Sequence, residues 1–383
     1  MNSIGIVLVC YNRLDSLKRL IRSLECANYE GYKPSLIFSI DYSGYDDITN
    51  FANQYNWNFG PKIVITHESN LGLREHIIQC GQLTKEYDSI IVLEDDIFVS
   101  KSYFQFAVNA AVYYENDANI AGISLYSFQK NWLKWNLRFE PFLTEYDTFF
   151  LKIAQSWGQV WTNSKWKSFY SWYQDNQNFE DQLDLPKYLY TWPKSSWLKY
   201  YTKYCIVKNK FFVYPYHSFT TNFSDLGTHS RFQSNDHQVE LLTYIKEFKF
   251  PRFDNSAIKY DEYMNLLNLA QYIDINEDEV CLDLWGTRTK PRQIRYYLTT
   301  KKMNYKILRT YQLSLRPIEM NIMYNLEGKG IFLYDTFAKA KNRIRIDDNL
   351  TIYSMRTSDW KVYLIAFLVS FRQFIKRKIR KQK

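Results

Sequence analysis

The first hundred residues constrain the fold most, because short apolar runs alternate there with segments of helical periodicity. The apolar runs occupy residues 4–10, 36–40, 63–66 and 90–93. Such runs are typical of strands buried on both faces of a parallel sheet. After the first run, apolar residues recur at the spacing of one helix face: Leu14, Leu17, Leu20, Ile21 and Leu24. This alternation predicts an α/β fold in which a Rossmann-like, doubly wound sheet is flanked by helices.

Polar side chains follow three of these predicted strands directly. Asp41 ends the second strand, Asn70 follows the third, and an acidic triplet at 94–96 follows the fourth. In open α/β sheets, ligands bind in the crevice outside the carboxyl ends of the strands. The sequence therefore predicts that these three segments meet at one polar binding site.

The acidic triplet Glu94-Asp95-Asp96 is the most informative motif in the chain. Three carboxylates at the exit of a buried strand are costly unless they are paired or bound to a metal. Hard oxygen ligands suit Mg²⁺ or Mn²⁺, and such a cation can bridge a diphosphate and absorb the charge of the leaving group. A solvated acidic turn is the simpler alternative. The buried strand before the triplet favours a metal-assisted site for a nucleotide-sugar.

Charge is distributed unevenly along the 383 residues. The net charge is +9, but the last twelve residues, 372–383, carry seven Lys or Arg and no acid. The rest of the chain is close to neutral, which argues against a nucleic-acid groove and favours a membrane-facing terminus. Residues 360–371, just before the basic run, are mostly apolar but too few for the ~20 residues that span a bilayer. We therefore expect residues 356–383 to form an interfacial helix on an anionic membrane, with a helix docked on the core as the alternative.

The cysteines and the N-terminus indicate the compartment. Five cysteines, at positions 10, 26, 80, 205 and 281, show no paired spacing and are predicted to be reduced. The N-terminus has neither a charged n-region nor a long apolar run, so no signal peptide is expected. Together with the basic tail, these features predict a cytoplasmic protein attached peripherally to the inner face of the cell membrane.

Several ordered motifs resemble those of known glycosyltransferases. The stretch IVLEDDIFVS at 91–100 resembles N-acetylglucosaminyltransferase I and its bacterial relatives in the GT-A superfamily. The opening VLVCYNR, the SID ending at Asp41 and the NLG at 70–72 resemble family 2 glycosyltransferases. TWPKSSW at 191–197 and NFSDLGTH at 222–229 continue the likeness, which covers about residues 4–240.

The resemblance implies a GT-A fold, which has a mixed sheet flanked by helices, and a role for individual residues. Nucleotide-sugar contacts would come from Arg13, Asp41, Asn70, Arg74, Glu94, Asp95 and His229. Asp96 would ligate Mn²⁺ or Mg²⁺, and His229 would lie in a lid over the donor. Trp157 and Gly158 would face the acceptor, although a core position for Trp157 is the commoner fate of a tryptophan. For Arg74, an ordinary place on a helix face is an equally good interpretation.

The catalytic base is where the sequence departs from the pattern. N-acetylglucosaminyltransferase I carries an Asp after the tryptophan that corresponds to Trp197, whereas Leu198 and Lys199 follow it here. An inverting transfer needs a carboxylate to deprotonate the attacking hydroxyl. Asp181, in a Glu-Asp pair of the family 2 type, is the preferred candidate, and Asp225 is the second.

The resulting hypothesis is a glycosyltransferase with three parts. Residues 1–245 would form the GT-A domain, with the nucleotide-sugar half at about 1–130 and the acceptor half at 131–245. Residues 246–355 would form a C-terminal extension of unknown role and residues 356–383 an amphipathic basic helix, and the C-terminal extension is expected to be α-rich. The enzyme would transfer a sugar from a UDP-sugar, with inversion, to a carbohydrate or lipid-linked glycan in bacterial surface polysaccharide or oligosaccharide synthesis. A retaining transferase and a non-catalytic carbohydrate-binding scaffold are the alternatives.

Overall fold

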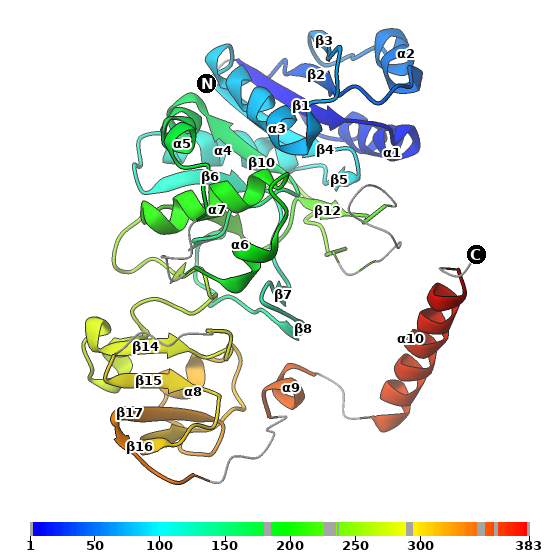
Figure 1. Cartoon of the computed structure of the whole chain (residues 1–383). Helices are drawn as coiled ribbons and strands as arrows, with labels where there is room; N and C mark the ends of the chain where they lie inside the picture. Colours follow the sequence, from blue (N-terminus) through cyan, green and yellow to red (C-terminus); the bar gives the residue numbers. More distant parts are fainter. Residues whose placement is uncertain are drawn as a thin grey trace.

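A nine-stranded sheet organises the main body of the protein (Figure 1). The computed structural model describes residues 3–179, 185–225, 235, 237–288, 294–342, 349–355 and 359–380. Within this part of the chain the strand order is β13-β9-β11-β6-β10-β4-β1-β2-β3. The strands are β1 (Ile4–Cys10), β2 (Ser35–Ile40), β3 (Lys62–Thr66), β4 (Ser89–Glu94), β6 (Ile120–Ser124), β9 (Thr148–Leu151), β10 (Gln159–Thr162), β11 (Phe211–Pro215) and β13 (Lys259–Tyr260).

The half of the sheet that we predicted from apolar runs is parallel. β1 pairs in parallel with both β2 and β4, and β2 pairs in parallel with β3. β10 then runs antiparallel to β4 and to β6, so the sheet as a whole is mixed. The predicted mixed sheet flanked by helices is therefore confirmed. Its last strand, β13, lies beyond the boundary that we placed at residue 245.

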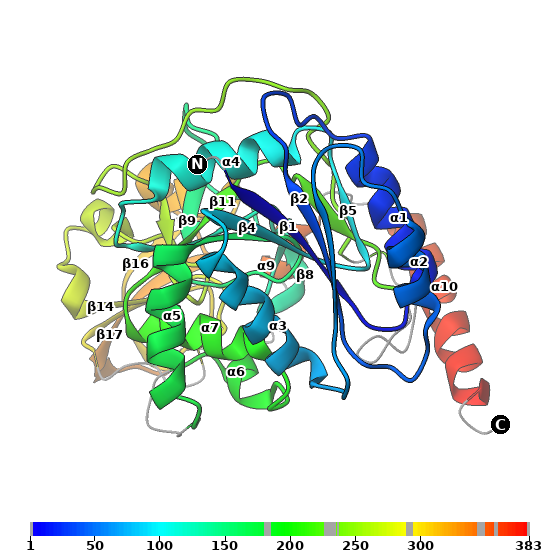
Figure 2. The same ribbon diagram turned by 90° about the horizontal axis from the view of Figure 1, so that it is seen from above.

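Helices cover both faces of this sheet (Figure 2). One face packs against α1 (Leu14–Glu25), α2 (Asp47–Gln54) and α4 (Tyr103–Tyr114), and the other against α3 (Gly72–Gln82), α5 (Asn163–Asp175) and α7 (Trp197–Val207). The apolar stripe of α1 shows why: Leu17, Leu20 and Leu24 are completely buried. Burial of such amphipathic faces, more than intrinsic helix propensity, stabilises helices of this length. Smaller elements complete this body: α6 (Lys187–Thr191), β5 (Ile97–Val99) paired with β12 (Thr220–Asn222), and β7 (Lys130–Asn131) paired with β8 (Lys134–Arg138).

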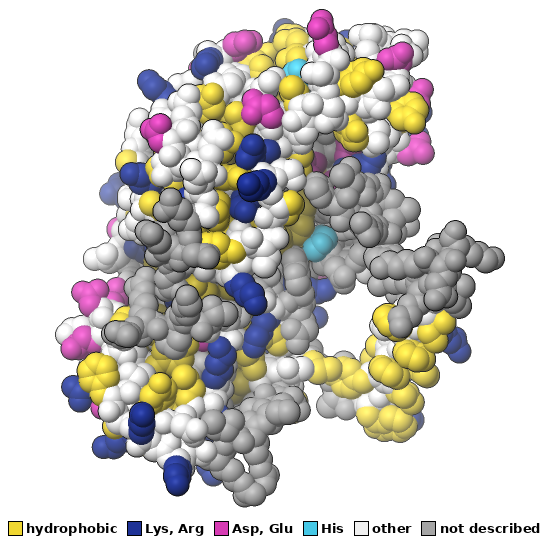
Figure 3. Space-filling model, viewed as in Figure 1, with side chains coloured by type: hydrophobic (Ala, Val, Ile, Leu, Met, Phe, Trp, Pro, Cys, Tyr) yellow, Lys and Arg dark blue, Asp and Glu magenta, His cyan; other side chains and the backbone are white. Residues whose placement is uncertain are grey.

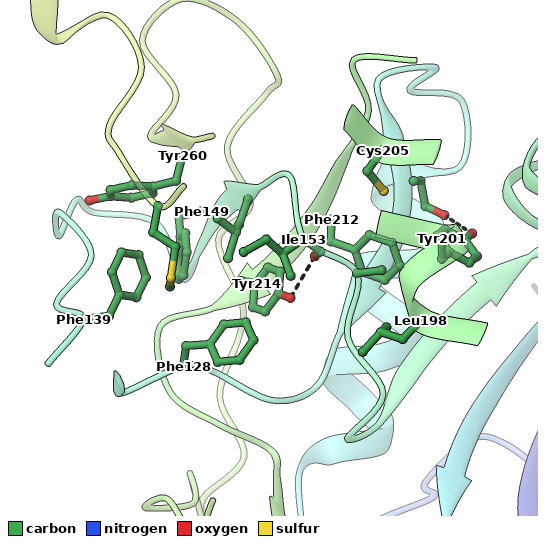
Figure 4. Packing of buried hydrophobic residues seen from close by; sticks show 14 of the residues in the cluster. Phe128, Phe139, Phe149, Ile153, Leu198, Tyr201, Cys205, Phe212, Tyr214 and Tyr260 are labelled. Atoms are coloured by element: carbon green, nitrogen blue, oxygen red, sulfur yellow. Dashed lines mark hydrogen bonds between the residues drawn. The ribbon is translucent and has the colours of Figure 1, made fainter. Parts of the chain in front are cut away.

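Aromatic side chains fill the core near β9, β11 and β13 (Figure 4). The rings of Phe139 and Tyr260 meet edge to face with centroids 5.1 Å apart. Two of the buried tyrosines have hydrogen-bonded hydroxyls: Tyr214 donates to the carbonyl of Ile153 at 2.9 Å, and Tyr201 donates to that of Ala121 at 2.8 Å. Much of the aromatic excess of the sequence is therefore structural.

A second, smaller sheet follows the main body along the chain. Its order is β14-β15-β17-β16, with β14 (Val280–Asp283), β15 (Tyr296–Thr299), β16 (Tyr305–Tyr311) and β17 (Ile331–Lys339). The predicted helical C-terminal region is present after it, as α9 (Asn349–Ser354) and α10 (Trp360–Arg380). Between the sheets lie the 3-10 turns η2 (Leu269–Ile273) and η3 (Glu277–Glu279), and α8 (Met320–Met323) precedes β17. In the described residues, no helix has the length and apolarity needed to cross a bilayer.

Candidate active site

A cleft of about 300 Å³ opens at the carboxyl ends of β1, β2 and β4. β1 has β2 on one side and β4 on the other, and such a point of divergence is where open α/β sheets bind ligands. The described residues that line it are Val9, Cys10, Tyr11, Asn12, Arg13, Asp41, Asn70, Leu73, His76, Glu94, Asp95, Asp96, Ser195 and Asp225. The three strand-end segments that we expected to meet do meet here.

Asp41 and Asn70 fix the shape of one wall of the cleft. The Asp41 carboxylate accepts hydrogen bonds from the backbone amides of Leu71 at 2.8 Å and Gly72 at 3.0 Å, where α3 begins. Asn70 donates its side-chain amide to the carbonyl of Tyr42 at 2.9 Å. The end of β2 is therefore tied to the start of α3. Both residues line the cleft as predicted, and their role toward a nucleotide stays a prediction.

A single arginine binds two of the three residues of the acidic triplet. Arg13 donates to Asp95 and also to Asp96, where the Nη1–Oδ2 distance is 3.1 Å. Asn222, on β12, donates its amide to the other oxygen of Asp96 at 3.1 Å, and the amide of Phe223 donates to the Asp96 carbonyl at 3.0 Å. The triplet thus connects α1 with β12 across the cleft. Within the described residues, no three His, Cys, Asp or Glu side chains are grouped as a metal site.

The electrostatics of the triplet are those of crowded, buried carboxylates. Burial raises the pKa of Glu94 to about 8, and the negative charge of Asp96 adds to the shift. Burial also raises the pKa of Asp95 to about 7, although Arg13 opposes the change. For Arg13, burial disfavours the charged form, but attraction to Asp95 and Asp96 outweighs it and raises its pKa above the usual range. This cleft would therefore gain from an additional cation.

These shifts predict that stability depends on pH through Glu94. A carboxyl with a raised folded-state pKa costs no stability below its ordinary value near 4.3, and costs progressively more as pH rises toward 8. Glu94→Gln should therefore stabilise the protein more at pH 8 than at pH 5, by roughly 1–2 kcal/mol, since partial exposure reduces the full linkage value. Urea denaturation at both pH values measures this. Glu145→Gln, at a side chain that is 70% exposed, is the control and should show no such trend.

Asp225 lies at the mouth of the cleft and is held by α1. Its carboxylate accepts a hydrogen bond from Ser16 Oγ at 2.6 Å and forms an ion pair with Arg19, whose guanidinium stacks on the Phe223 ring at 3.9 Å. Burial disfavours the charged Asp225, but the hydrogen bonds from Arg19 and Ser16 outweigh it and hold its pKa below the ordinary value. This pairing makes Asp225 a weaker base than a free carboxylate.

Three residues with predicted ligand roles lie away from the lining of this cleft. Arg74 points to α7, where it donates to the Tyr200 hydroxyl at 3.1 Å. Trp157 is half-buried among other rings and contacts His237 in a tilted arrangement, with the ring centroids 4.4 Å apart. Gly158 has a φ of +94°, a value that disfavours any other residue. Direct contact of Arg74 with the diphosphate, and of Trp157 and Gly158 with the acceptor, remains a prediction.

Gly158 also lies against β12, which gives a stability prediction. A Cβ added there would come within 2.7 Å of Thr220 Cγ2, whereas one added to Gly44, with a φ of +79°, would meet nothing within 4 Å. Gly158→Ala should therefore cost about 2–4 kcal/mol, from strain and overpacking together, and Gly44→Ala only about 1 kcal/mol from strain. Chemical denaturation of both variants measures the difference. Equal losses would show that the contact with Thr220 relaxes freely.

The sequence did not single out some of the residues that build the site. Ser195 lines the cleft from within the TWPKSSW motif, and Ser16 and Arg19 act through Asp225. The motif itself was the only available signal for Ser195. Two predicted residues, Asp181 and His229, lie outside the described residues.

Comparison with known proteins agrees with this geometry. The model of glycosyl transferase family 2 matches residues 5–171, which include β1 to β4 and the acidic triplet. This part of the chain resembles a family 2 glycosyltransferase. The match and the mixed, helix-flanked sheet support a glycosyltransferase enzyme with a GT-A fold. A search among curated proteins found no match.

Solved glycosyltransferase structures show weaker likenesses. S. aureus TarS 1-349 has a TM-score of 0.39 at 10% identity, over 58% of this chain and 60% of that one. GalNAc-T7 with UDP, GalNAc and Mn²⁺ has a TM-score of 0.40 at 14% identity, and the likeness covers 56% of this chain and 43% of that one. The mannosyltransferase PcManGT from Pyrobaculum calidifontis, with GDP-Man and Mn²⁺, has a TM-score of 0.31 at 8% identity. This likeness covers 47% of this chain and 48% of that one. The chain thus spans about 60% or less of these proteins, and at such low TM-scores the assignment rests on the family match.

Proposed function

We propose that this protein transfers a sugar from a nucleotide-sugar, with UDP as the nucleotide, to a carbohydrate acceptor. The observation that carries the proposal is the acidic triplet at the end of β4, which lies in the cleft between the diverging strands β2 and β4. That position suits the diphosphate of a nucleotide-sugar. Bacterial surface polysaccharide or oligosaccharide synthesis is the process that we propose for it.

A divalent cation, Mn²⁺ or Mg²⁺, is part of the proposal because the side chains that line the cleft are mostly acidic. Five carboxylates line it, from Asp41, Glu94, Asp95, Asp96 and Asp225, whereas Arg13 is the only Lys or Arg among the described lining residues. A dianionic diphosphate would be repelled from such a surface. Asp96 would provide the protein oxygen, the diphosphate would provide others, and the cation would neutralise charge on the leaving nucleotide.

The residues of this chain have separate tasks in the proposed transfer. Asp41 holds the loop at the start of α3, against which the nucleotide would lie. Arg13 is the described cationic side chain that can move from the triplet to the donor phosphates, as a cation takes its place on Asp96. A carboxylate must accept the proton of the acceptor hydroxyl in an inverting transfer, and we assign this to Asp181. Binding of the donor would also exclude water from the cleft.

A panel of UDP-sugars, incubated with the full chain and Mn²⁺, tests this proposal. The expected result is release of UDP above the rate in buffer, together with a new glycoside when a suitable acceptor is present. Nucleotide-sugar binding without any release, across acceptors and metals, would favour a non-catalytic carbohydrate-binding scaffold instead. Failure to bind any nucleotide-sugar would contradict the donor class.

A further inference from the structure

Helix α10 stands beside the main body and exposes an unusually apolar surface. Figures 1 and 2 both place it on the side of the molecule where β5 lies, and Figure 1 shows β12 on that side too. Figure 3 shows its hydrophobic side chains at the surface. Ten large apolar side chains of this helix are 42–65% exposed: Trp360, Val362, Leu364, Ile365, Phe367, Leu368, Val369, Phe371, Phe374 and Ile375. A helix docked on the core would bury such residues, so the docked arrangement is not what is observed.

The spacing of these residues gives α10 a continuous apolar stripe. Trp360, Leu364, Phe367, Phe371 and Phe374 recur at i, i+4, i+7, i+11 and i+14, which is one face of a helix. At 1.5 Å per residue, the 21 residues are about 31 Å long. Contiguous apolar surface of this kind marks an interaction site for a protein or a membrane.

The charge of the segment decides between these two partners. Residues 360–383 contain eight Lys or Arg and no Asp or Glu. A second copy of the same helix would bring like charges together and could offer no acidic partner. An anionic lipid surface offers both an apolar layer for the stripe and negative head groups for the basic residues.

The position of α10 relative to the cleft indicates which side of the protein would face a surface bound to α10. β12 lies on the same side of the molecule as α10 (Figure 1). The cleft is joined to β12, because Asn222 contacts Asp96 and Asp225 follows shortly after. A surface that holds α10 therefore lies on the side of the molecule where β12 contacts the cleft, and away from β3, which lies at the top of Figure 1.

We propose that α10 lies in the head-group layer of an anionic membrane and holds the cleft toward it, so that the acceptor is presented at the lipid surface. The membrane contact stands on α10 alone, while the statement about the acceptor rests on the proposed function. This arrangement selects a lipid-linked glycan over a soluble sugar as the acceptor class, because a tethered enzyme meets tethered acceptors at a high effective concentration.

Vesicle sedimentation of the full chain tests the membrane contact. We expect binding to vesicles of phosphatidylcholine with about one-third phosphatidylglycerol at low salt, and at least tenfold weaker binding to pure phosphatidylcholine. High salt should weaken the binding to anionic vesicles by a similar factor, because the surface potential is screened. A wild-type chain that ignores anionic vesicles at low salt would overturn the proposal. So would self-association through α10 without lipid binding.

Two matched sets of variants assign the effect to α10. Leu364→Ser with Phe367→Ser should lower vesicle binding at least tenfold, whereas Tyr324→Ser with Phe337→Ser, at side chains 64% and 74% exposed, should leave it unchanged. For charge, Arg377→Gln with Lys378→Gln should weaken binding severalfold and reduce its salt dependence. The exposed pair Lys306→Gln with Lys329→Gln is the control. Equal losses in test and control pairs would contradict a site on α10.

Hydrogen exchange of the vesicle-bound chain tests the orientation. Protection should appear in α10 and in residues 220–225 near the cleft, and should be absent from β3 at the opposite edge. Protection of β3 would overturn the orientation. UDP release by the α10 variants in solution distinguishes the proposed enzyme from the proposed membrane contact. Variants that release UDP but do not bind vesicles would leave the glycosyltransferase proposal intact. A wild-type chain that binds vesicles but releases no UDP would support the membrane contact alone.

Discussion

Replacing Asp96 by Ala should abolish sugar transfer, and an excess of chelator should do the same to the wild-type enzyme. The reason is the charge of the cleft: five acidic side chains line it, Arg19 already pairs with one of them, Asp225, and Arg13 is the only Lys or Arg among the described lining residues. Loss of the cation should raise the barrier for departure of the nucleotide by several kcal/mol. Transfer at the full rate in excess chelator would remove the metal from the mechanism.

The binding of UDP separates this loss from a loss of folding. In the wild type, Mn²⁺ should strengthen UDP binding at least tenfold, as measured by calorimetry, whereas in Asp96→Ala the metal should have little effect. The melting temperature must be followed too, because Asp96 accepts hydrogen bonds from Arg13 and Asn222. Asp46→Ala, at an exposed carboxylate outside the cleft, is the control. It should retain both activity and the effect of the metal on UDP binding.

The sequence predicted the first half of the sheet well because its strands are buried on both faces. β1, β2 and β4 consist almost wholly of buried residues, so their apolar runs are uninterrupted. The second sheet lacked this signal. In β16 (Tyr305–Tyr311), four consecutive residues are exposed, and polar side chains break the alternation that marks a half-buried strand. The sheet that precedes the terminal helices could therefore not be predicted from the sequence, whereas the helical C-terminal region was.

Strand ends located the candidate site, but pairing between distant residues could not be predicted. Asp41, Asn70 and the triplet follow strands, so topology alone brings them together. Arg13 and Asp95 are 82 positions apart, and Arg19 and Asp225 are 206 apart. No local pattern encodes such contacts. The positive φ of Gly158 was likewise invisible in a motif that we interpreted as an acceptor site.

Asp181→Asn should lower the rate of transfer by about 10²–10⁴-fold, the usual contribution of a general base. Asp181 stays our preferred base from the sequence, and Asp225 is the weaker candidate, because Arg19 and Ser16 occupy the Asp225 carboxylate and hold its pKa below the ordinary value. A carboxylate stabilised in this way is a poor acceptor for the proton of a sugar hydroxyl. The affinity for UDP should stay near the wild-type value, since the substitution is isosteric.

Three measurements make this prediction specific to the base. Glu180→Gln, at the neighbouring acid, should retain activity and is the matched control. Asp225→Asn should weaken donor binding more than the chemical step, because it releases the segment after β12 from α1. The anomeric configuration of the product, read by NMR, then decides between mechanisms. Inversion with a slow Asp181→Asn variant is the expected outcome. Retention, or full turnover by that variant, would reject Asp181 as the base, because a retaining transferase on the same fold does not need a carboxylate to activate the acceptor in this way.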